Sequence, residues 1–371
     1  MPITKTFTEG ADSFVAKVND IFQLDFAGGD DVLRVVAGAV TAHMGSGNDR
    51  VRIDGGSATI FGDAGMDRFD CYGGNATISG GADNDRFNIW GGSNVLDGGT
   101  GDDLFVSYGA ASGLQLNGGD GNDRFYGFSS NGGQHVTLSG GAGNDLYRVL
   151  SNSGPTVVER LGEGTDTVQV APGINYTLGE NLENLRVVDS LGAGEDAILA
   201  GNGLRNLITG SSGRDTIQGM GGNDTIVGGA GNDTIDGGDG NDRITGGLGG
   251  DTMAGGAGGD LFVYSSVNDS PYAGGSYAEE DFITDWTPLD HIDLSAVDAN
   301  SLLPGQQHFN FAGYSFGLPP ATHEAGSLWI GGFGGELYVI GFTDNDTTPD
   351  FLISLWASQD EGSLKVDNLI L

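Results

Sequence analysis

A nine-residue repeat between Gly210 and Phe262 constrains the fold more than any other feature of the sequence. Six copies follow one another without a gap, and each reads approximately Gly-Gly-x-Gly-x-Asp-x-apolar-x. The aspartates are Asp215, Asp224, Asp233, Asp242, Asp251 and Asp260, and the first glycines are Gly210, Gly219, Gly228, Gly237, Gly246 and Gly255. Such a short fixed period is the sequence signature of a solenoid, in which each repeat stacks only on its neighbours.

A second array fills the first half of the chain with a longer and less regular period. Its acidic motifs include GSGNDRV, GGADNDRF and GGAGNDLY, and their aspartates are Asp49, Asp67, Asp85, Asp103, Asp123 and Asp145. These lie 18, 18, 18, 20 and 22 residues apart, with acid-free turns such as GGSATIF between them. Since 18 is two repeats, one coil would contain two short strands and two turns. Asp31 and Asp166 resemble degenerate copies at the ends of this array.

These spacings predict an all-β protein, a parallel β-roll or β-solenoid with strands ~4.8 Å apart from coil to coil. Acidic turns would follow one edge of the first array and both edges of the second. Side chains alternate along a strand, so Phe69 and Cys71, Phe87 and Ile89, and Ala58 and Ile60 would point inward. His43, aligned beside Phe61, would point outward.

Composition along the chain predicts four segments. Residues 1–170 form the first solenoid block with coils of about 18 residues, and residues 171–206, which lack the period, form a spacer. Residues 207–264 form the tandem nonapeptide block. Residues 265–371 contain three of the four tryptophans and strand-like runs such as ELYVIGF, which predict a β-rich cap over the end of the solenoid.

The chain has many more acidic than basic residues, so its own side chains cannot neutralise its negative charge. Acidic residues number 51 against 15 basic ones, a net charge of −36. Such a chain repels polyanions, so we expect neither nucleic acid nor anionic membrane surfaces as partners. No apolar run approaches the ~18 residues of a membrane-spanning helix. Cys71 is the only cysteine, so no internal disulfide can form.

The repeats offer oxygen ligands in place of that missing positive charge. Glycines allow backbone conformations that aim carbonyl oxygens inward, and the sixth-position aspartate adds a carboxylate. Oxygen ligands without imidazole or thiolate suit hard cations, and an irregular cage favours calcium over magnesium. We therefore predict that the aspartates of both arrays and the first glycines of the tandem repeats bind multiple Ca²⁺ ions. Binding would drive folding, because the sites exist only in the folded coil.

The pattern resembles the calcium-binding repeat of RTX (repeats-in-toxin) proteins. The segments LFVYSSVNDS (261–270), DFITDWTPLDHIDLS (281–295) and TPDFLISL (348–355) are similar to the C-terminal domain of serralysin-type proteases and to repeat modules of mannuronan epimerases. The resemblance implies a β-roll with calcium between turns. It also implies export by a type I secretion apparatus through an uncleaved C-terminal signal, whose form Asp367–Leu371 matches.

Two further features bear on localisation and catalysis. The start, MPITKTFTEGADSF, lacks the basic and apolar regions of a cleaved signal peptide, so we expect a secreted protein without one. Serralysins carry an HExxH zinc motif, which is absent here, and the histidines are scattered at positions 43, 135, 291, 308 and 323. GYSFG (313–317) fits the nucleophile elbow of lipases, but the surrounding glycine-rich β sequence does not suit the strand–turn–helix that this motif requires.

Other charged residues have two interpretations each. Arg50, Arg68, Arg86 and Arg124 would form an outward column that either compensates acids such as Asp54 and Asp70 or binds an anionic glycan. Two further groups are either calcium ligands or ordinary structural residues. They are Asp344, Asp346 and Asp350 in one turn, and Asp281, Asp285, Asp290 and Asp293 in the predicted cap.

The sequence therefore predicts a secreted calcium-binding protein without catalytic residues, acting as a surface, matrix or adhesion component. The alternatives are a repeat and export module of an extracellular enzyme of the metalloprotease, lipase or polysaccharide epimerase type, or a polysaccharide-binding module. An enzyme with an acidic groove on the first array is a further class, disfavoured because no His, Lys or Ser cluster occurs. Calcium, the secretion apparatus and extracellular polysaccharide or a cell surface are the expected partners.

Overall fold

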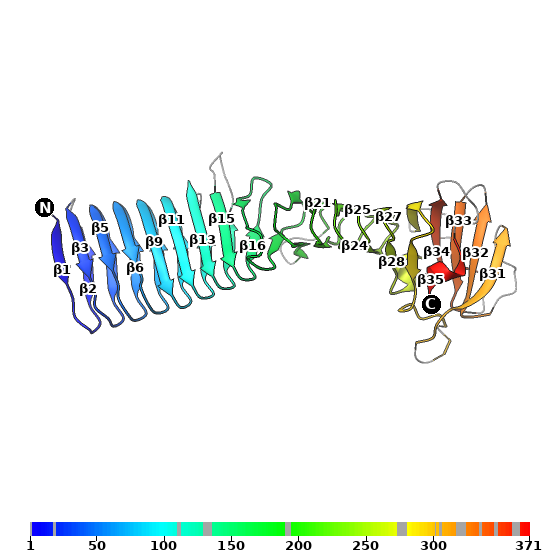
Figure 1. The fold of residues 1–371 in the computed structure, drawn as a ribbon, viewed down its shortest axis with the longest axis horizontal. Coiled ribbons are helices and arrows are strands. Elements are labelled where there is room, and N and C mark those ends of the chain that lie inside the picture. Colours follow the sequence, from blue (N-terminus) through cyan, green and yellow to red (C-terminus); the bar gives the residue numbers. More distant parts are fainter. Residues whose placement is uncertain are drawn as a thin grey trace. The chain divides into compact units, whose positions relative to one another are not determined.

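The computed structural model describes residues 2–17, 20–109, 113–128, 136–189, 194–272, 280–300, 302–303, 306–316, 324–333, 336–344, 348–357 and 364–371. The described chain has regular secondary structure that is almost entirely β-strand. It forms two compact units, Met1–Val170 with Gly179–Leu182, and Ala171–Leu178 with Glu183–Leu371. Within each unit, parallel strands stack coil upon coil (Figure 1). The predicted all-β parallel solenoid is confirmed.

Unit 1 consists of two parallel sheets whose strands alternate along the chain. The first sheet contains β1 (Ile3–Thr6), β3 (Ile21–Asp25), β5 (Ala39–His43), β7 (Ser57–Phe61), β9 (Asn75–Ala82), β11 (Ser93–Thr100), β13 (Leu114–Asp120), β15 (Val136–Ala142) and β17 (Thr156–Val157). The second contains β2 (Ser13–Ala16), β4 (Val32–Val35), β6 (Arg50–Ile53), β8 (Arg68–Cys71), β10 (Arg86–Ile89), β12 (Leu104–Ser107), β14 (Arg124–Phe128), β16 (Leu146–Val149) and β18 (Thr167–Val170). Strands pair in register, so each coil repeats the one before it; Arg68 lies opposite Arg86 and Phe69 opposite Phe87.

A column of stacked aromatic rings fills the core of unit 1. The rings of Phe69, Phe87, Phe105, Phe125 and Tyr147 lie 4.5 to 5.0 Å apart, centroid to centroid. Aromatic side chains provide the largest buried area of any residue type, so this column is a main source of packing energy. The six side chains predicted to point inward are all buried, and His43 is exposed and stacked on Phe61. The predicted alternation is confirmed.

Unit 2 contains two series of strands, mostly parallel in the repeat region and partly antiparallel towards the C-terminus. One series of strands is β20 (Asn184–Val187), β22 (Leu207–Thr209), β24 (Thr225–Ala230), β26 (Arg243–Leu248), β28 (Leu261–Val263), β30 (His291–Asp293) and β35 (Leu369–Ile370). The other is β19 (Tyr176–Thr177), β21 (Ile198–Ala200), β23 (Thr216–Gln218), β25 (Thr234–Asp239), β27 (Thr252–Ala257), β29 (Asp281–Trp286), β34 (Phe351–Ala357), β33 (Glu336–Phe342), β32 (Ser327–Phe333) and β31 (Asn310–Phe316). Strands β32, β33 and β34 are antiparallel neighbours.

The segments outside the nonapeptide period contribute strands of their own. Residues 171–206, predicted as a spacer, contain β19, β20 and β21, and β21 pairs in parallel with β23 of the tandem block. At the C-terminal side, β29 and β30 pair in parallel with the repeat strands β27 and β28. The tail predicted as a secretion signal forms a 3-10 turn, Val366–Asn368, and strand β35 beside β30. A second 3-10 turn spans Val267–Asp269. Among the described residues, none lies in a helix with the length and hydrophobicity needed to cross a membrane.

Candidate metal centres

The sixth-position aspartates of unit 1 form a continuous hydrogen-bonded ladder. The Oδ1 atom of each aspartate accepts the backbone N–H of the corresponding aspartate one coil earlier, at 2.6 to 2.8 Å. The ladder runs through Asp12, Asp31, Asp49, Asp67, Asp85, Asp103, Asp123, Asp145 and Asp166. It lies along one edge of the coil, as predicted, and uses one oxygen of each carboxylate to hold two coils together.

Unit 2 has two such ladders, one along each edge, which again matches the predicted placement of acidic turns. The first ladder links Ala197, Asp215, Asp233, Asp251 and Asp281. The second links Asn206, Asp224, Asp242, Asp260 and Asp290. Asp281 and Asp290 follow their predecessors by 30 residues instead of 18, so the period alone could not identify them as ladder members.

The second carboxylate oxygen of most ladder aspartates is buried and has no hydrogen-bond partner. Among the described residues, these Oδ2 atoms belong to Asp31, Asp49, Asp67, Asp85, Asp103, Asp123, Asp145, Asp224, Asp233, Asp242, Asp251, Asp260 and Asp281. Asp215 differs, because its Oδ2 accepts the Ser211 N–H at 2.5 Å. A buried anionic oxygen without a partner is costly, and native proteins satisfy almost all buried polar groups. A bound cation beside these Oδ2 atoms would remove this cost.

Main-chain oxygens converge on the same places. A Cβ atom added at Gly80 would collide with Asp85 Oδ2 and with the carbonyl oxygen of Gly98 in the next coil. The same pair of atoms, the aspartate Oδ2 and the carbonyl oxygen of the next coil's glycine, surrounds Gly62, Gly98, Gly118, Gly210, Gly219, Gly228 and Gly237. At Gly246 and Gly255, the nearest atoms all belong to Asp251 or Asp260. Each first glycine thus leaves open a small cradle lined by oxygen, which any larger residue would fill.

Burial dominates the electrostatics of these carboxylates. It raises the pKa of Asp67, Asp85 and Asp145 to about 8, with backbone hydrogen bonds opposing the shift and neighbouring acids adding to it. The pKa is raised, again mainly by burial, to about 7 for Asp103, Asp224 and Asp233 and to about 6 for Asp49, Asp123, Asp251 and Asp260. A cation beside Oδ2 would reverse the shift by favouring the charged form.

The donor set fits a hard cation. In the part of the chain that the structure describes, no three His, Cys, Asp or Glu side chains gather as a metal site, and the oxygens found beside the first glycines are one carboxylate oxygen and, at most of them, one main-chain carbonyl oxygen. One carboxylate oxygen with carbonyl oxygens is the chemistry of calcium, which accepts irregular oxygen cages at 2.3–2.6 Å. The assignment of calcium to the predicted site residues stays a prediction.

The irregular repeats of unit 1 preserve this geometry. Asp83 stands where the motif GGADNDRF lacks its third glycine, and it adopts φ 75°, in the left-handed region that aspartate tolerates better than most residues. Exposed side chains next to the aspartates add further links between coils: Asn48 Oδ1 accepts the Met66 N–H at 2.9 Å, and Asn84 Oδ1 accepts the Asp102 N–H at 2.9 Å. The departures from the repeat pattern therefore leave the coil intact.

The other candidate residues have varied surroundings. In the predicted cap, Asp285 accepts the N–H groups of Gly255 and Gly256, and Asp293 accepts from Ser295. Asp350 accepts the Thr343 N–H, whereas Asp346 lies outside the described residues.

Ser315 of the GYSFG motif lies within strand β31, which pairs with β32. The described part of the motif is therefore strand, not the strand–turn–helix of a nucleophile elbow. Of the scattered histidines, His135 and His323 lie outside the described residues.

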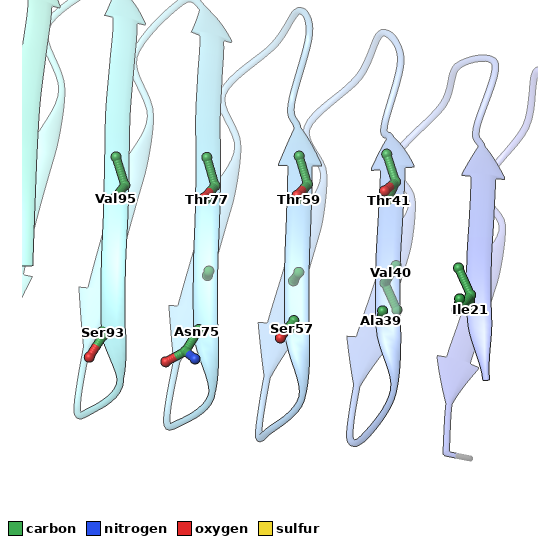
Figure 2. Close-up of a pocket in the computed structure, with 12 residues that line it drawn as sticks. Ile21, Ala39, Val40, Thr41, Ser57, Thr59, Asn75, Thr77, Ser93 and Val95 are labelled. Atoms are coloured by element: carbon green, nitrogen blue, oxygen red, sulfur yellow. The ribbon is translucent and has the colours of Figure 1, made fainter. Parts of the chain in front are cut away.

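A shallow groove crosses the outer face of the first sheet of unit 1. It is about 290 Å³ in volume, and Figure 2 shows Thr41, Thr59 and Thr77 in a row on successive strands, with Ser57 and Asn75 in a second row. None of the residues that line it is ionisable. The groove can form hydrogen bonds to a ligand, but its side chains contain no carboxylate, imidazole, amine or thiol for acid–base or nucleophilic chemistry.

A match to a protein-family model agrees with this chemistry. The RTX calcium-binding nonapeptide repeat matches residues 72–105, 115–131, 132–148, 200–235 and 227–262. Among solved structures, the chain is similar to the AlgE6R2 subunit of the mannuronan C5-epimerase from Azotobacter vinelandii, with 24% identity, a TM-score of 0.25, and coverage of 46% of this chain and 91% of that one. The AlgE6R3 subunit of the same epimerase gives 26% identity, a TM-score of 0.21, and coverage of 46% and 80%. No curated protein matches. The chain therefore carries RTX calcium-binding nonapeptide repeats in both of its units.

Proposed function

We propose that the chain is a secreted calcium-binding scaffold whose coils fold when extracellular calcium fills the cradles between successive aspartates. The observation that carries this proposal is the row of buried Oδ2 atoms without hydrogen-bond partners, those of Asp67, Asp85, Asp103, Asp123, Asp224, Asp233 and Asp242 each lying beside a glycine that is also approached by a carbonyl oxygen of the next coil. Calcium bound there would neutralise part of the net charge of −36. Its binding free energy would become folding free energy, because the cradle is absent from the unfolded chain.

The difference in calcium concentration between the cytosol and the outside of the cell would determine where the chain folds. Extracellular calcium modules bind with dissociation constants of about 10⁻⁴ to 10⁻³ M, so such sites stay empty in the cytosol and fill outside the cell. An unfolded chain in the cytosol suits export by a type I secretion apparatus, and the tail Asp367–Leu371 has the form expected of its signal. We assign the folded protein a non-catalytic role at a surface, in a matrix or in adhesion. The alternative is service as the repeat and export module of an extracellular enzyme.

Replacing Gly228 with alanine tests whether the cradles bind calcium. The new methyl would collide with Asp233 Oδ2 and the Gly246 carbonyl oxygen, so we expect loss of calcium at that cradle and a decrease in the free energy of unfolding of about 2–4 kcal/mol. Calorimetric titration with calcium gives the number of ions, and thermal melts give the stability.

Gly203→Ala is the matched control, since nothing lies within 4 Å of a Cβ at Gly203. It should leave both measurements near their original values. Equal calcium binding by the original protein and by Gly228→Ala would show that the cradles are not the calcium sites.

A second candidate function, binding of an anionic polysaccharide, is favoured by the charge of one face of unit 1. Seven of the chain's 15 basic residues occupy exposed or half-buried positions on β4, β6, β8, β10, β14 and β16. They are Arg34, Arg50, Arg52, Arg68, Arg86, Arg124 and Arg148. Asp70 is the only acidic residue within these strands. Arginine pairs with carboxylates in bidentate geometry, and uronic acids present one carboxylate per sugar.

Charge compensation explains only part of this face. Arg50 and Arg68 pair with Asp70 at 3.1 and 3.0 Å, and Arg34 and Arg52 pair with Asp54 at 2.6 and 2.7 Å. Two carboxylates therefore serve four guanidinium groups. Arg86 instead bonds Asn88 at 2.9 Å, and Arg148 bonds Gln169 at 3.2 Å. This surplus of positive charge supports the binding of a carboxylated glycan.

The triple variant Arg86→Gln, Arg124→Gln, Arg148→Gln tests this second function. At fixed calcium and salt, we expect it to bind a uronic-acid oligosaccharide about tenfold more weakly than the original protein, because charge-assisted hydrogen bonds are lost. The control Arg186→Gln, Arg205→Gln, Arg214→Gln changes the net charge equally on exposed residues of unit 2. Equal loss by both triples would indicate bulk electrostatics, and no loss by either would dismiss the site.

A further inference from the structure

The row of cradles in unit 1 ends at Gly140 with different chemistry from the rest. Around Gly62, Gly80, Gly98 and Gly118, the aspartate Oδ2 is accompanied by the carbonyl oxygen of the next coil's glycine. At Gly140, the neighbouring oxygens are Asp145 Oδ2 and the hydroxyl of Tyr147. Tyr147 continues the core column of phenylalanines with one added oxygen, so a side-chain hydroxyl is among the nearest atoms at the last cradle, where the earlier cradles have a glycine carbonyl oxygen.

The carboxylate of Glu159 lies beside the same cradle. Its carboxylate accepts the Gly140 N–H at 2.7 Å, the Gly141 N–H at 3.4 Å and the Tyr147 hydroxyl. In an earlier coil the corresponding acceptor is main chain: the Gly62 N–H donates to the Ser79 carbonyl oxygen at 2.9 Å. Glu159 is only 5% exposed. A carboxylate has about four lone-pair positions, so these three hydrogen bonds still leave it able to bind an ion.

Asp145 contributes a free oxygen to the same place. The residue is 2% exposed, and its Oδ2 has no hydrogen-bond partner. Burial is the main cause that raises the pKa of Asp145 to about 8, and the charges of Asp123, Asp166 and Glu159 add to the shift. Two buried carboxylates at one cradle repel each other unless a proton or a cation lies between them.

The same arrangement occurs independently at the end of a column in unit 2. Asp285 accepts the N–H groups of Gly255 and Gly256 at 3.0 and 2.8 Å, as Glu159 does for Gly140 and Gly141. Asp260 Oδ2, beside Gly255, is likewise buried without a partner. Both columns therefore end in a carboxylate that takes over the two glycine N–H groups where the repeat runs out.

We infer that Asp145, Glu159 and Tyr147 hold a hard divalent cation that closes the first array and binds more tightly than the ions of the interior cradles. The inference rests on the proposed function for its ion, but it concerns residues outside the nonapeptide repeat. Each interior cradle presents one carboxylate oxygen, whereas this one presents two carboxylates, and calcium affinity rises with the charge of the ligands. The ion would tie the coil that contains β15 to the segment that follows β17, the last strand of the first sheet.

Glu159→Gln tests the terminal site, because the amide oxygen can still accept the Gly140 N–H while the charge is lost. Calcium titration of the full chain should show one ion fewer, or one site weakened by about 10- to 100-fold. Terbium serves as a luminescent substitute for calcium that a nearby tyrosine sensitises. Tyr147→Phe, which restores the residue of earlier coils, should reduce that emission while the chain remains folded.

Glu180→Gln is the control, since Glu180 is exposed in the same unit and the charge change is equal. It should alter neither measurement. If Glu159→Gln lowers only thermal stability and leaves ion number, affinities and terbium emission unchanged, Glu159 is a structural plug and the inference is overturned. If the original protein binds no calcium at all, the proposed function itself fails, which is a different result from calcium binding that is insensitive to Glu159.

Discussion

Withdrawing calcium is expected to unfold both arrays of this protein. In the described part of the chain, thirteen ladder aspartates have a buried Oδ2 without a partner, and burial of such an anionic oxygen is unfavourable when no ion is present. An ion at tenfold excess over its dissociation constant stabilises the fold by about 1.4 kcal/mol per site. Over even half of these aspartates, this is comparable with the total stability of about 5–15 kcal/mol of an ordinary domain.

Far-ultraviolet circular dichroism and hydrodynamic radius during calcium titration measure this transition. The calcium-free chain should be expanded and lack strand signal, and millimolar calcium should restore a compact β-protein in a cooperative step, since each coil stacks on its neighbours. Magnesium at the same concentration is the control. It should restore little structure, because it demands near-octahedral geometry and dehydrates reluctantly. An unchanged spectrum and radius after complete calcium removal would contradict the account.

Protonation of the ladder carboxylates is expected to stabilise the metal-free fold in part, as calcium would. The ladder carboxylates have a pKa of 3.8 in the unfolded chain, and burial raises the pKa of Asp67, Asp85 and Asp145 to about 8 in the metal-free fold. Between these values the folded state binds more protons than the unfolded state, so its stability falls as pH rises through this window. Lowering the pH of the metal-free chain from 8 towards 4 should therefore increase its structure.

With calcium present the sign reverses. Protons then compete with the ion for the same oxygens, so the melting temperature of the calcium-loaded protein should fall as the pH falls. Thermal melts across this pH range, in metal-free buffer and in millimolar calcium, should give two curves of opposite slope. Parallel curves would show that the carboxylates do not exchange protons for metal.

The coil and its ladders could be predicted because they depend on a periodic pattern. The spacing of 18 residues, twice the nonapeptide, indicated two strands and two turns per coil, and the alternate positions of Phe69 and Cys71 indicated which face is buried. Both follow from the geometry of strands, in which side chains alternate and neighbours lie at a fixed spacing.

The ends of the arrays could not be predicted in the same way. Glu159 and Asp285 act on glycine N–H groups 19 and 30 residues earlier, and neither lies in a repeat motif. Asp281 joins its ladder across an interval of 30 residues. These residues contact the last coils from segments where the repeat period has stopped. Their positions therefore follow from the three-dimensional arrangement and not from the spacing of motifs. Asp31 and Asp166 were visible as degenerate motifs, and the structure places both in the ladder.

The most direct test of the central claim is a crystal structure of the protein grown in calcium, with anomalous diffraction measured at long wavelength. The account predicts a peak between Asp233 Oδ2 and the carbonyl oxygen of Gly246, with equivalent peaks along each ladder. Ligand distances should fall within about 2.3–2.6 Å. The account would be contradicted by a folded coil in which these carboxylates contact only water or protein and no anomalous peak lies beside them.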